Sequence, residues 1–419
     1  MIRNSAYLKG LILLFSGSIV SQGITFLFAP IISRLFSPEQ MGAYTLILSV
    51  VNMFGAIVCA RYDMVIISSE NEKEVYNLIS LSAIIGVISS FLVSIGFYIY
   101  TLVNTELKSI IGDWSVIVFP ILVVYSFTNI LNAYNNRHGE YGLISQVNVI
   151  RVTIQGILQT ISGFIGVGSI GLVISYLISN IFGLKRQAHK LLKNIDKIKL
   201  VTKEGIIATL IKYKNQPMFS VPAIFFNSAS YSLLPFFINS MFNPREVGLY
   251  SISFRLLGVP LALISTNFSR VFFQKASDYY NKNKDFRKLY VKTALLLLAI
   301  ALPMVFILML WSEEIIVIVF GADWADASVY IRTLAPMFGI RLIVSALSVS
   351  LIITNKQKYD MILQSLFLVS TVIVYFVSNT LSFKIDTFIL MISILFSANY
   401  LIYGYIGYYY SKNVSGGKL

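Results

Sequence analysis

The sequence predicts an all-α membrane protein in which twelve transmembrane helices form two six-helix lobes. Three observations support this fold class. The mean hydropathy is +0.75, with 56% hydrophobic and only 12% charged residues, which no soluble domain of this size shows. Long apolar stretches recur along the chain, and a helix needs roughly 20 apolar residues to cross a bilayer. Finally, matching features occur at corresponding places in the two halves of the chain.

The apolar stretches follow one another with mostly short loops between them. The predicted spans are 9–33, 42–66, 78–102, 115–133, 143–163, 165–184, 215–239, 247–271, 289–311, 328–353, 361–380 and 387–410. The first stretch is followed at once by a second and carries no small-residue cleavage site. It is therefore expected to be a retained helix rather than a signal peptide.

The distribution of basic residues predicts the orientation. With both termini in the cytoplasm, the inner segments hold 25 Lys and Arg residues, whereas the outer loops hold 4. This asymmetry follows the positive-inside rule. The net charge of +14 thus indicates contact with membrane lipids, whose headgroups are anionic, and not binding of nucleic acid.

Few residues are suited to metal or nucleophilic chemistry. Cys59 is the single cysteine, so neither an internal disulfide nor a cysteine-based metal cluster is possible, and His138 and His189 are the only histidines. No glycine-rich phosphate loop, zinc spacing or nucleophile elbow occurs. The sequence predicts no cofactor, no metal and no catalytic residue, hence a protein that is not an enzyme.

A short motif occurs once in each half. Residues 36–44 (FSPEQMGAY) and 242–250 (FNPREVGLY) share Phe, Pro, Gly and Tyr at a constant offset, and each copy joins the first and second spans of its half. Ser37 or Asn243 can cap the following helix, and proline suits its first turn. Two parallel repeats are therefore expected. The predicted domains are an N-terminal lobe (1–184), a lysine-rich cytoplasmic linker (185–214) and a C-terminal lobe (215–419).

The linker has an amphipathic pattern, with Leu191, Leu192, Ile195 and Ile198 between its lysines. A helix of this kind is typical of the surface of a membrane. We therefore expect the linker to lie against the cytoplasmic side of the bilayer.

Polar side chains recur at helical spacing in several spans and predict a cavity wall, because such groups are expensive in lipid. The alternative is that these stripes are helix-packing seams. The ninth, eleventh and twelfth spans are apolar nearly all round and are expected to face lipid. The polar residues expected to line the cavity are Gln22, Thr25, Asn52, Asn148, Gln155, Gln159, Asn227 and Ser251.

Arginines inside the predicted spans indicate the kind of ligand that the protein binds. Arg151, Arg255 and Arg341 lie inside spans, without a carboxylate at comparable depth. An unpaired guanidinium is costly in a membrane, so a water-filled cationic cavity that holds an anion is the expected environment. Arginine suits phosphate because its fork bonds two oxygens at once.

Two further arginines are weaker candidates for the same cavity. Arg332 and Arg61 lie near span ends, where extension of the side chain to the interface is the alternative. Asp63 is the one candidate for ion coupling. The prolines expected to act as hinges are Pro30, Pro217, Pro222 and Pro235.

These features resemble the polysaccharide flippases of the multidrug/oligosaccharidyl-lipid/polysaccharide (MOP) exporter superfamily, and most closely the O-antigen (Wzx) type. The resemblance rests on the turn at 37–44, on Arg61-Tyr62 and on the second turn at 243–250. It implies two lobes in a V, as in multidrug (MATE) exporters, with a cationic cavity and alternating access in the bacterial inner membrane.

The resemblance also implies a substrate and partners. The substrate would be a short saccharide linked by pyrophosphate to undecaprenol, flipped during O-antigen and lipopolysaccharide biosynthesis. A polysaccharide polymerase and a chain-length protein are the further candidate partners.

Three alternatives remain open. A MATE-like multidrug exporter usually keeps a buried acid, and a lipid II or teichoic-type flippase of this superfamily usually has fourteen spans. A membrane-embedded polymerase or glycosyltransferase usually needs a sizeable outer loop, whereas the longest outer loops here, around 103–114 and 312–327, are short.

Overall fold

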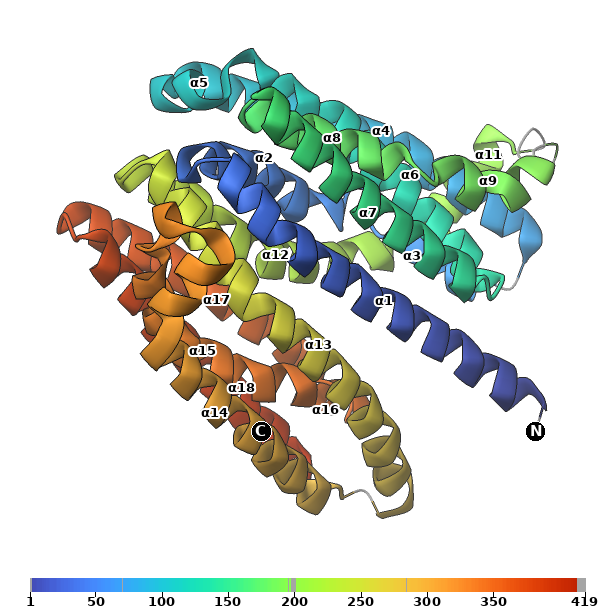
Figure 1. Ribbon diagram of the computed structural model, residues 1–419. Coiled ribbons are helices and arrows are strands. Elements are labelled where there is room, and N and C mark those ends of the chain that lie inside the picture. The colour runs from blue at the N-terminus through green and yellow to red at the C-terminus, as the bar shows by residue number, and fades with distance from the viewer. Residues whose placement is uncertain (1, 70, 195, 197–200, 284, 413–419) are drawn as a thin grey trace. The chain divides into compact units, whose positions relative to one another are not determined.

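The computed structural model describes residues 2–69, 71–194, 196, 201–283 and 285–412. Within these residues the regular structure is helical, and the chain divides into two compact units, Met1–Ser232 (unit 1) and Leu233–Leu419 (unit 2). Each unit is described by itself below (Figure 1).

The helices of unit 1 are α1 (Ile2–Leu35), α2 (Pro38–Gly55), α3 (Tyr62–Ser68), α4 (Glu72–Val103), α5 (Thr105–Ile111), η1 (Gly112–Ile117), α6 (Val118–Arg137), α7 (Tyr141–Ile165), α8 (Ser169–Ile181), α9 (Leu184–Lys193) and α11 (Lys203–Lys212). Helix α12 (Asn215–Met241) runs from unit 1 into unit 2. The helices of unit 2 are α13 (Pro244–Asn283), α14 (Arg287–Phe320), η2 (Ala322–Trp324), α15 (Ala327–Leu347), α16 (Ser350–Ile353), α17 (Gln357–Thr380) and α18 (Ile385–Tyr410).

Nine helices in the described part of the chain are long and apolar enough to cross a bilayer. They coincide with nine of the twelve predicted spans, which confirms a multi-pass membrane protein. The other three predicted spans differ from a simple long apolar helix. Span 42–66 is divided between α2 and α3, span 143–163 is the more polar α7, and span 165–184 contains α8, which has 13 residues. The count of twelve and the cytoplasmic position of both termini stay predictions.

The repeated turn begins α2 and α13 as the sequence predicts. The Ser37 side chain accepts a hydrogen bond from the backbone N–H of Gln40, and the Gln40 side chain accepts one from the N–H of Ser37. In unit 2 the Asn243 side chain accepts a hydrogen bond of 3.0 Å from the N–H of Glu246. Both caps satisfy N–H groups that a helix start leaves without a partner.

A break interrupts the second predicted span between α2 and α3. Ala60 and Arg61 adopt left-handed backbone conformations, with φ of 48° and 64°. Two of the carbonyls that the break releases find donors. The Asn129 amide of α6 donates to the carbonyl of Gly55 (3.0 Å), and the Arg61 guanidinium donates to that of Ala56 (3.4 Å). Irregular backbone at this depth is tolerated where such partners replace the helical bonds.

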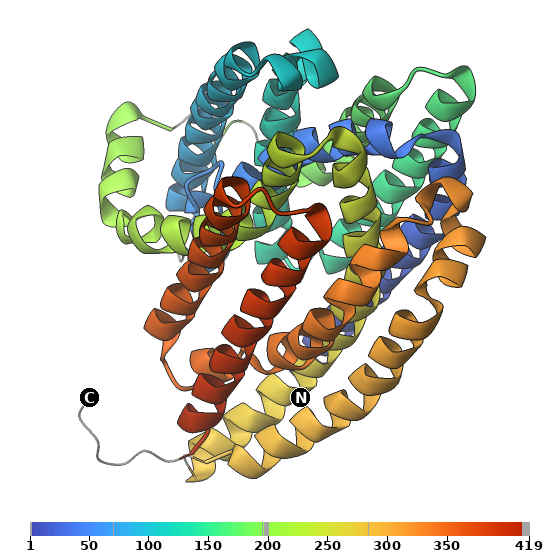
Figure 2. The same cartoon turned by 90° about the vertical axis from the view of Figure 1, so that its left-hand side faces the viewer.

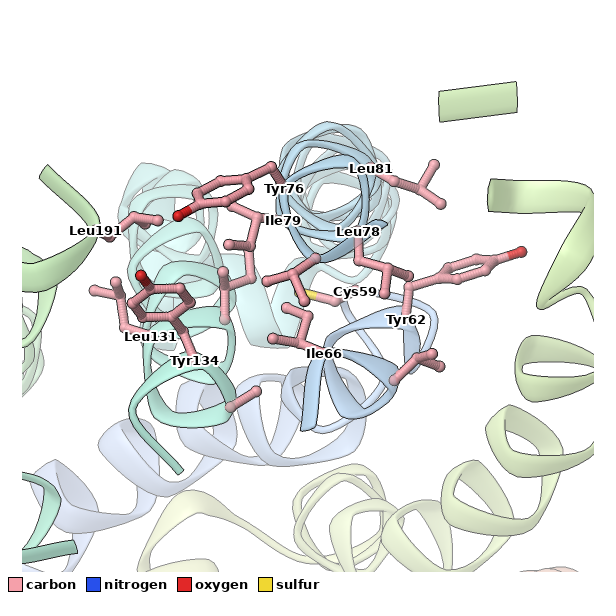
Figure 3. Packing of buried hydrophobic residues seen from close by; sticks show 14 of the residues in the cluster. Cys59, Tyr62, Ile66, Tyr76, Leu78, Ile79, Leu81, Leu131, Tyr134 and Leu191 are labelled. Carbon is pink, nitrogen blue, oxygen red and sulfur yellow. The ribbon is translucent and has the colours of Figure 1, made fainter. Parts of the chain in front are cut away.

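Unit 1 buries an apolar cluster behind this break (Figure 3). Cys59 and Ile66 from the α2–α3 segment pack against Leu78 of α4, and Leu131 of α6 closes the cluster from the other side. Leu191 of α9 joins the same cluster, so a linker helix forms part of this core.

The linker packs on unit 1 through polar contacts as well. Gln187 of α9 is 1% exposed, and its carbonyl accepts a hydrogen bond from the Asn135 side chain at 3.0 Å. On α11, the carbonyl of Leu210 accepts a bond from the Tyr62 hydroxyl, and Lys212 pairs with Glu74 of α4. The hydrogen bond that Lys212 donates to Glu74 raises the pKa of Lys212 above its ordinary value.

Helices α9 and α11 therefore pack on unit 1 through residues that the lysine-rich sequence does not single out. The position of this segment at the cytoplasmic surface of the membrane stays a prediction. Ile195 and Ile198, which the amphipathic pattern also used, lie outside the described residues.

In unit 2, α15 is the central helix. It packs against α13, α14 and α18, and the long helices run alongside one another (Figure 2). Phe272, Phe286 and Tyr290 form an aromatic cluster where α13 and α14 meet. On α14, Leu297, Ala301 and Leu308 are buried, whereas the opposite side of this helix exposes many apolar side chains. That the exposed side of this helix faces lipid stays a prediction.

Candidate functional site

Arg341 of α15 lies against two aromatic rings in unit 2. Its guanidinium carbon is 5.5 Å from the ring centre of Phe254 and 5.3 Å from that of Phe338. The two rings also contact each other edge to face at 5.0 Å. Attraction between a guanidinium and aromatic faces restricts the position of the cation.

Arg255 follows Phe254 on α13 and therefore lies within one residue of the ring that contacts Arg341. Its side chain is half-buried, and it makes no hydrogen bond or ion pair with the residues that the structure describes. The structure thus places two of the predicted arginines on helices that pack against each other, Arg255 on α13 and Arg341 on α15. That the two side chains act on one anion stays a prediction.

Arg151 belongs to unit 1 and is 8% exposed. Its Nε donates to the carbonyl of Phe182 at 3.0 Å, and its Nη2 donates to the Gln187 side chain at 3.4 Å. Phe182 is the residue at which α8 ends, so Arg151 caps a helix C-terminus and joins α7 to α9. These contacts give Arg151 a structural role, while substrate binding by this residue stays a prediction.

Arg332 and Arg341 point to different neighbours of α15. The Arg332 guanidinium donates to the Ser312 hydroxyl (2.8 Å) and to the Glu313 carboxylate (3.3 Å), both on α14. Arg341 instead contacts α13 through Phe254. The nine-residue separation predicts opposite directions on an ideal helix, and α15 continues through Pro336 without interruption.

Arg61 and Asp63 lie at the α2–α3 break. Asp63 is 4% exposed, and its Oδ1 has no hydrogen-bond partner among the described residues; the same holds for Nε of Arg61. The two side chains are close in sequence, yet no ion pair joins them within the described part of the chain. Ion coupling through Asp63 stays a prediction.

Three of the predicted polar residues connect helices inside unit 1. Gln155 and Gln159 of α7 donate to the Tyr44 hydroxyl of α2 at 3.3 and 3.4 Å. The Asn148 side chain donates to the Ser21 hydroxyl of α1 at 3.0 Å. Sequence reasoning missed Tyr44 as the shared acceptor, although its place in the repeated turn was a signal.

The other predicted polar residues differ in their surroundings. Thr25 and Ser251 bond to backbone carbonyls of their own helices, at 2.9 Å in both cases. Asn52 is exposed on α2, Gln22 is half-buried on α1, and Asn227 is half-buried on α12. A lining role for all eight residues stays a prediction.

The predicted hinges lie inside long helices. Pro30 is within α1, while Pro217, Pro222 and Pro235 are within α12. Proline removes a backbone hydrogen bond and weakens a helix locally. Bending at these positions stays a prediction.

Comparison with known proteins identifies the family. Residues 31–329 match the model of a family described as polysaccharide biosynthesis protein, and the chain belongs to this family. A search of curated proteins gave no match.

Solved structures establish the fold. The lipid II flippase MurJ in an inward closed conformation has a TM-score of 0.72 at 17% identity, covering 96% of this chain and 86% of that one. An inward-facing MATE family multidrug resistance transporter of the MOP superfamily has a TM-score of 0.62 at 15% identity, with 95% and 93% covered. A MOP superfamily transporter from Pyrococcus furiosus has 0.57 at 15% identity, with 96% and 94% covered.

These likenesses show an all-α membrane fold of the MATE and MurJ kind. The chain is therefore a multi-pass membrane protein whose fold is similar to those of MurJ and of MATE family transporters, and it belongs to a polysaccharide biosynthesis family.

Proposed function

We propose that this protein is a flippase. It moves undecaprenyl-pyrophosphate-linked O-antigen-type repeat units from the cytoplasmic to the periplasmic leaflet of the bacterial inner membrane, by alternating access through a cationic cavity. Membership of the polysaccharide biosynthesis family supports a saccharide cargo. Similarity to the lipid II flippase MurJ supports the transport of a lipid-linked one.

The observation that carries the proposal is the presence of two arginines on the packed helices α13 and α15 of unit 2. Arg255 makes no ion pair with the described residues, and Arg341 lies against the rings of Phe254 and Phe338. A pyrophosphate offers oxygens to both guanidinium forks, and charge-assisted hydrogen bonds of this kind are about twice as strong as neutral ones. The prenyl chain would stay in lipid while the charged head passes.

Arg255 and Arg341 are the residues that we assign to the pyrophosphate. Arg151 and Arg332 already have hydrogen-bond partners in their own units. Arg61 donates to Ala56 next to the helix break. In this proposal Arg151, Arg332 and Arg61 support the site and do not contact the pyrophosphate directly.

The test is flipping in proteoliposomes. Undecaprenyl-pyrophosphate-linked saccharide is placed in both leaflets, and its accessibility to an external glycosidase is followed. Protein-free vesicles expose about half of the saccharide, whereas active protein exposes nearly all of it.

Arg255→Ala/Arg341→Ala should lower the rate by about 100-fold, because two charge-assisted bonds of about 1.5 kcal/mol each are lost. Arg→Lys at both positions should recover part of it. Arg245→Ala is the matched control: it removes an exposed arginine of α13 that pairs with Asp326. A normal rate in the double Ala variant would rule the assignment out.

A multidrug exporter is the second candidate, favoured by the likeness to MATE transporters. Correctly folded protein that fails to flip the saccharide yet expels a cationic dye along a cation gradient would establish it. Arginines that attract anions argue against such a cargo.

A further inference from the structure

A shallow groove of about 450 Å³ lies beside the first turns of α14 in unit 2. Its lining residues are Arg287, Lys288, Val291, Lys292 and Leu295. Three are cationic and two are aliphatic, and all lie within about 12 Å along the helix axis. The groove therefore combines positively charged side chains near the start of α14 with an apolar surface directly next to them.

The three cations differ in how firmly they are held. The Arg287 guanidinium carbon lies 4.2 Å from the ring centre of Tyr408, and its Nη2 donates to the hydroxyl of that tyrosine. The backbone N–H of Arg287 donates to the Asp285 carboxylate at 2.9 Å. Lys288 and Lys292 are exposed. One cation is thus fixed in position, and two long side chains beside it are free to adjust around an anion.

An exposed apolar stripe continues from the groove along α14. Val291 and Leu295 are followed at helical spacing by further side chains on the same side of the helix, and Leu295 is 60% exposed. The stripe continues through Leu298, Leu302, Phe306 and Met309. From Val291 to Leu302 it covers about 16 Å, which is about half the thickness of the hydrocarbon core.

We propose that this groove binds the headgroup of an anionic phospholipid, with one acyl chain lying along the stripe. A soluble anion would meet the cations but leave the aliphatic half of the groove in water. A zwitterionic lipid would cover the stripe but bring no net charge to the three cations. Charge complementarity and the continuous apolar stripe together select a lipid with a net negative charge. With the predicted orientation, this lipid belongs to the cytoplasmic leaflet.

The inference does not depend on the proposed cargo. Binding is measured on the full-length protein in detergent by native mass spectrometry, with phosphatidylglycerol and phosphatidylcholine as probes. Each basic residue near an anionic lipid surface favours binding by about fivefold. Lys288→Gln/Lys292→Gln should therefore lower the affinity for phosphatidylglycerol by roughly 10- to 30-fold and leave that for phosphatidylcholine unchanged.

The matched control removes the same charge elsewhere in unit 2. Lys275 and Lys282 are exposed on α13 and do not line the groove. Lys275→Gln/Lys282→Gln should keep the preference for phosphatidylglycerol. Equal affinity of the unaltered protein for the two lipids, or an equal loss in the control variant, would overturn the proposal.

A second measurement locates the acyl chain. In a Cys59→Ser background, Leu298→Cys carries a bimane label, and phosphatidylglycerol brominated on its chains should quench it more strongly than brominated phosphatidylcholine. A label at Lys358→Cys, on the exposed start of α17, serves as the control. Displacement of the brominated lipid by a small amount of undecaprenyl phosphate would assign the groove to a polyprenyl lipid instead and overturn the phospholipid assignment.

Discussion

Arg341 shows how a single contact can prepare a charge for binding. The rings of Phe254 and Phe338 restrict where the guanidinium can move, so part of the ordering cost is met before a ligand arrives. The arginine was visible in the sequence, but the rings that hold it were not. Phe254 is 87 positions away and reaches Arg341 only through the packing of α13 on α15.

Phe254→Leu tests this contact. The variant loses the ring beneath Arg341, which is worth about 0.5–2 kcal/mol. We expect the substrate concentration for half-maximal flipping to rise by about two- to thirtyfold, with the protein still folded. Phe306→Leu, on the exposed stripe of α14, should change this concentration by less than about twofold. Equal effects of the two substitutions would mean that the ring serves packing only.

Arg151 is predicted to stabilise unit 1. Arg151→Ala leaves the Phe182 carbonyl and the Gln187 side chain without this donor, so the free energy of unfolding should fall by about 2 kcal/mol. The apparent melting temperature in detergent should fall by a few degrees. Arg255→Ala should change it little, because Arg255 has no such contact among the described residues.

A double-variant cycle separates the two roles of Arg151. Arg151→Ala and Gln187→Ala should be less than additive, since both remove the same hydrogen bond. An unchanged melting temperature in Arg151→Ala together with lost flipping would show that this arginine serves the substrate alone.

At the scale of elements, the α2–α3 break is the feature that the sequence did not reveal. Span 42–66 is apolar throughout most of its length, and proline is absent from it. The break depends on partners from elsewhere, notably Asn129 of α6, which bonds to the carbonyl of Gly55. Local propensity alone would continue the helix, and tertiary contacts override it.

Ala60→Gly should stabilise the protein. Ala60 has a φ of 48°, a conformation that costs an alanine about 1 kcal/mol and a glycine almost nothing. The apparent melting temperature in detergent should rise by one or two degrees. Ala56, with φ of −68° and ψ of −19°, is in the ordinary helical region, so Ala56→Gly should lower it. A decrease in both variants would contradict the left-handed conformation at Ala60.

The helix starts contrast with the break because they depend on adjacent residues. Ser37 and Asn243 cap α2 and α13 as the repeated turn predicts, since the donor lies only three residues beyond the acceptor. The linker lies between these extremes. Its amphipathic pattern predicts a helix at the membrane surface, and this stays a prediction. The burial of Gln187 by residues of α6 and α7 is a feature that no local pattern identifies.

At the scale of the whole molecule, composition and a short repeated motif were enough to predict a membrane protein and its all-α fold. Hydropathy and the repeat predicted an all-α membrane fold, which the likeness to MurJ and MATE structures confirms. The number of spans is harder to predict, because α7 carries Arg151 and several glutamines, while α8 is short. Hydrogen bonds between side chains inside the bundle make such helices possible, and a hydropathy profile does not detect these bonds.

The twelve-span topology predicts which loops are reached from outside. In a Cys59→Ser background, Lys108→Cys and Lys384→Cys should react with a membrane-impermeant maleimide in intact cells. Lys193→Cys and Lys358→Cys should react only after permeabilisation. Labelling of both Lys108→Cys and Lys384→Cys from the cytoplasmic side alone would contradict the predicted orientation, and opposite sides for the two positions would contradict the predicted number of spans.

The attachment of the linker has a mechanical consequence. Leu191 is embedded in the core of unit 1, Gln187 bonds to α6 and α7, and Lys212 pairs with α4. Helices α9 and α11 are thus part of unit 1 and not a flexible connection between the two units. We infer that a change of angle between the two units would be taken up in α12, which runs from unit 1 into unit 2 and in which Pro222 and Pro235 lack the N–H of a helical hydrogen bond. A single proline-weakened helix would then serve as the joint of the protein.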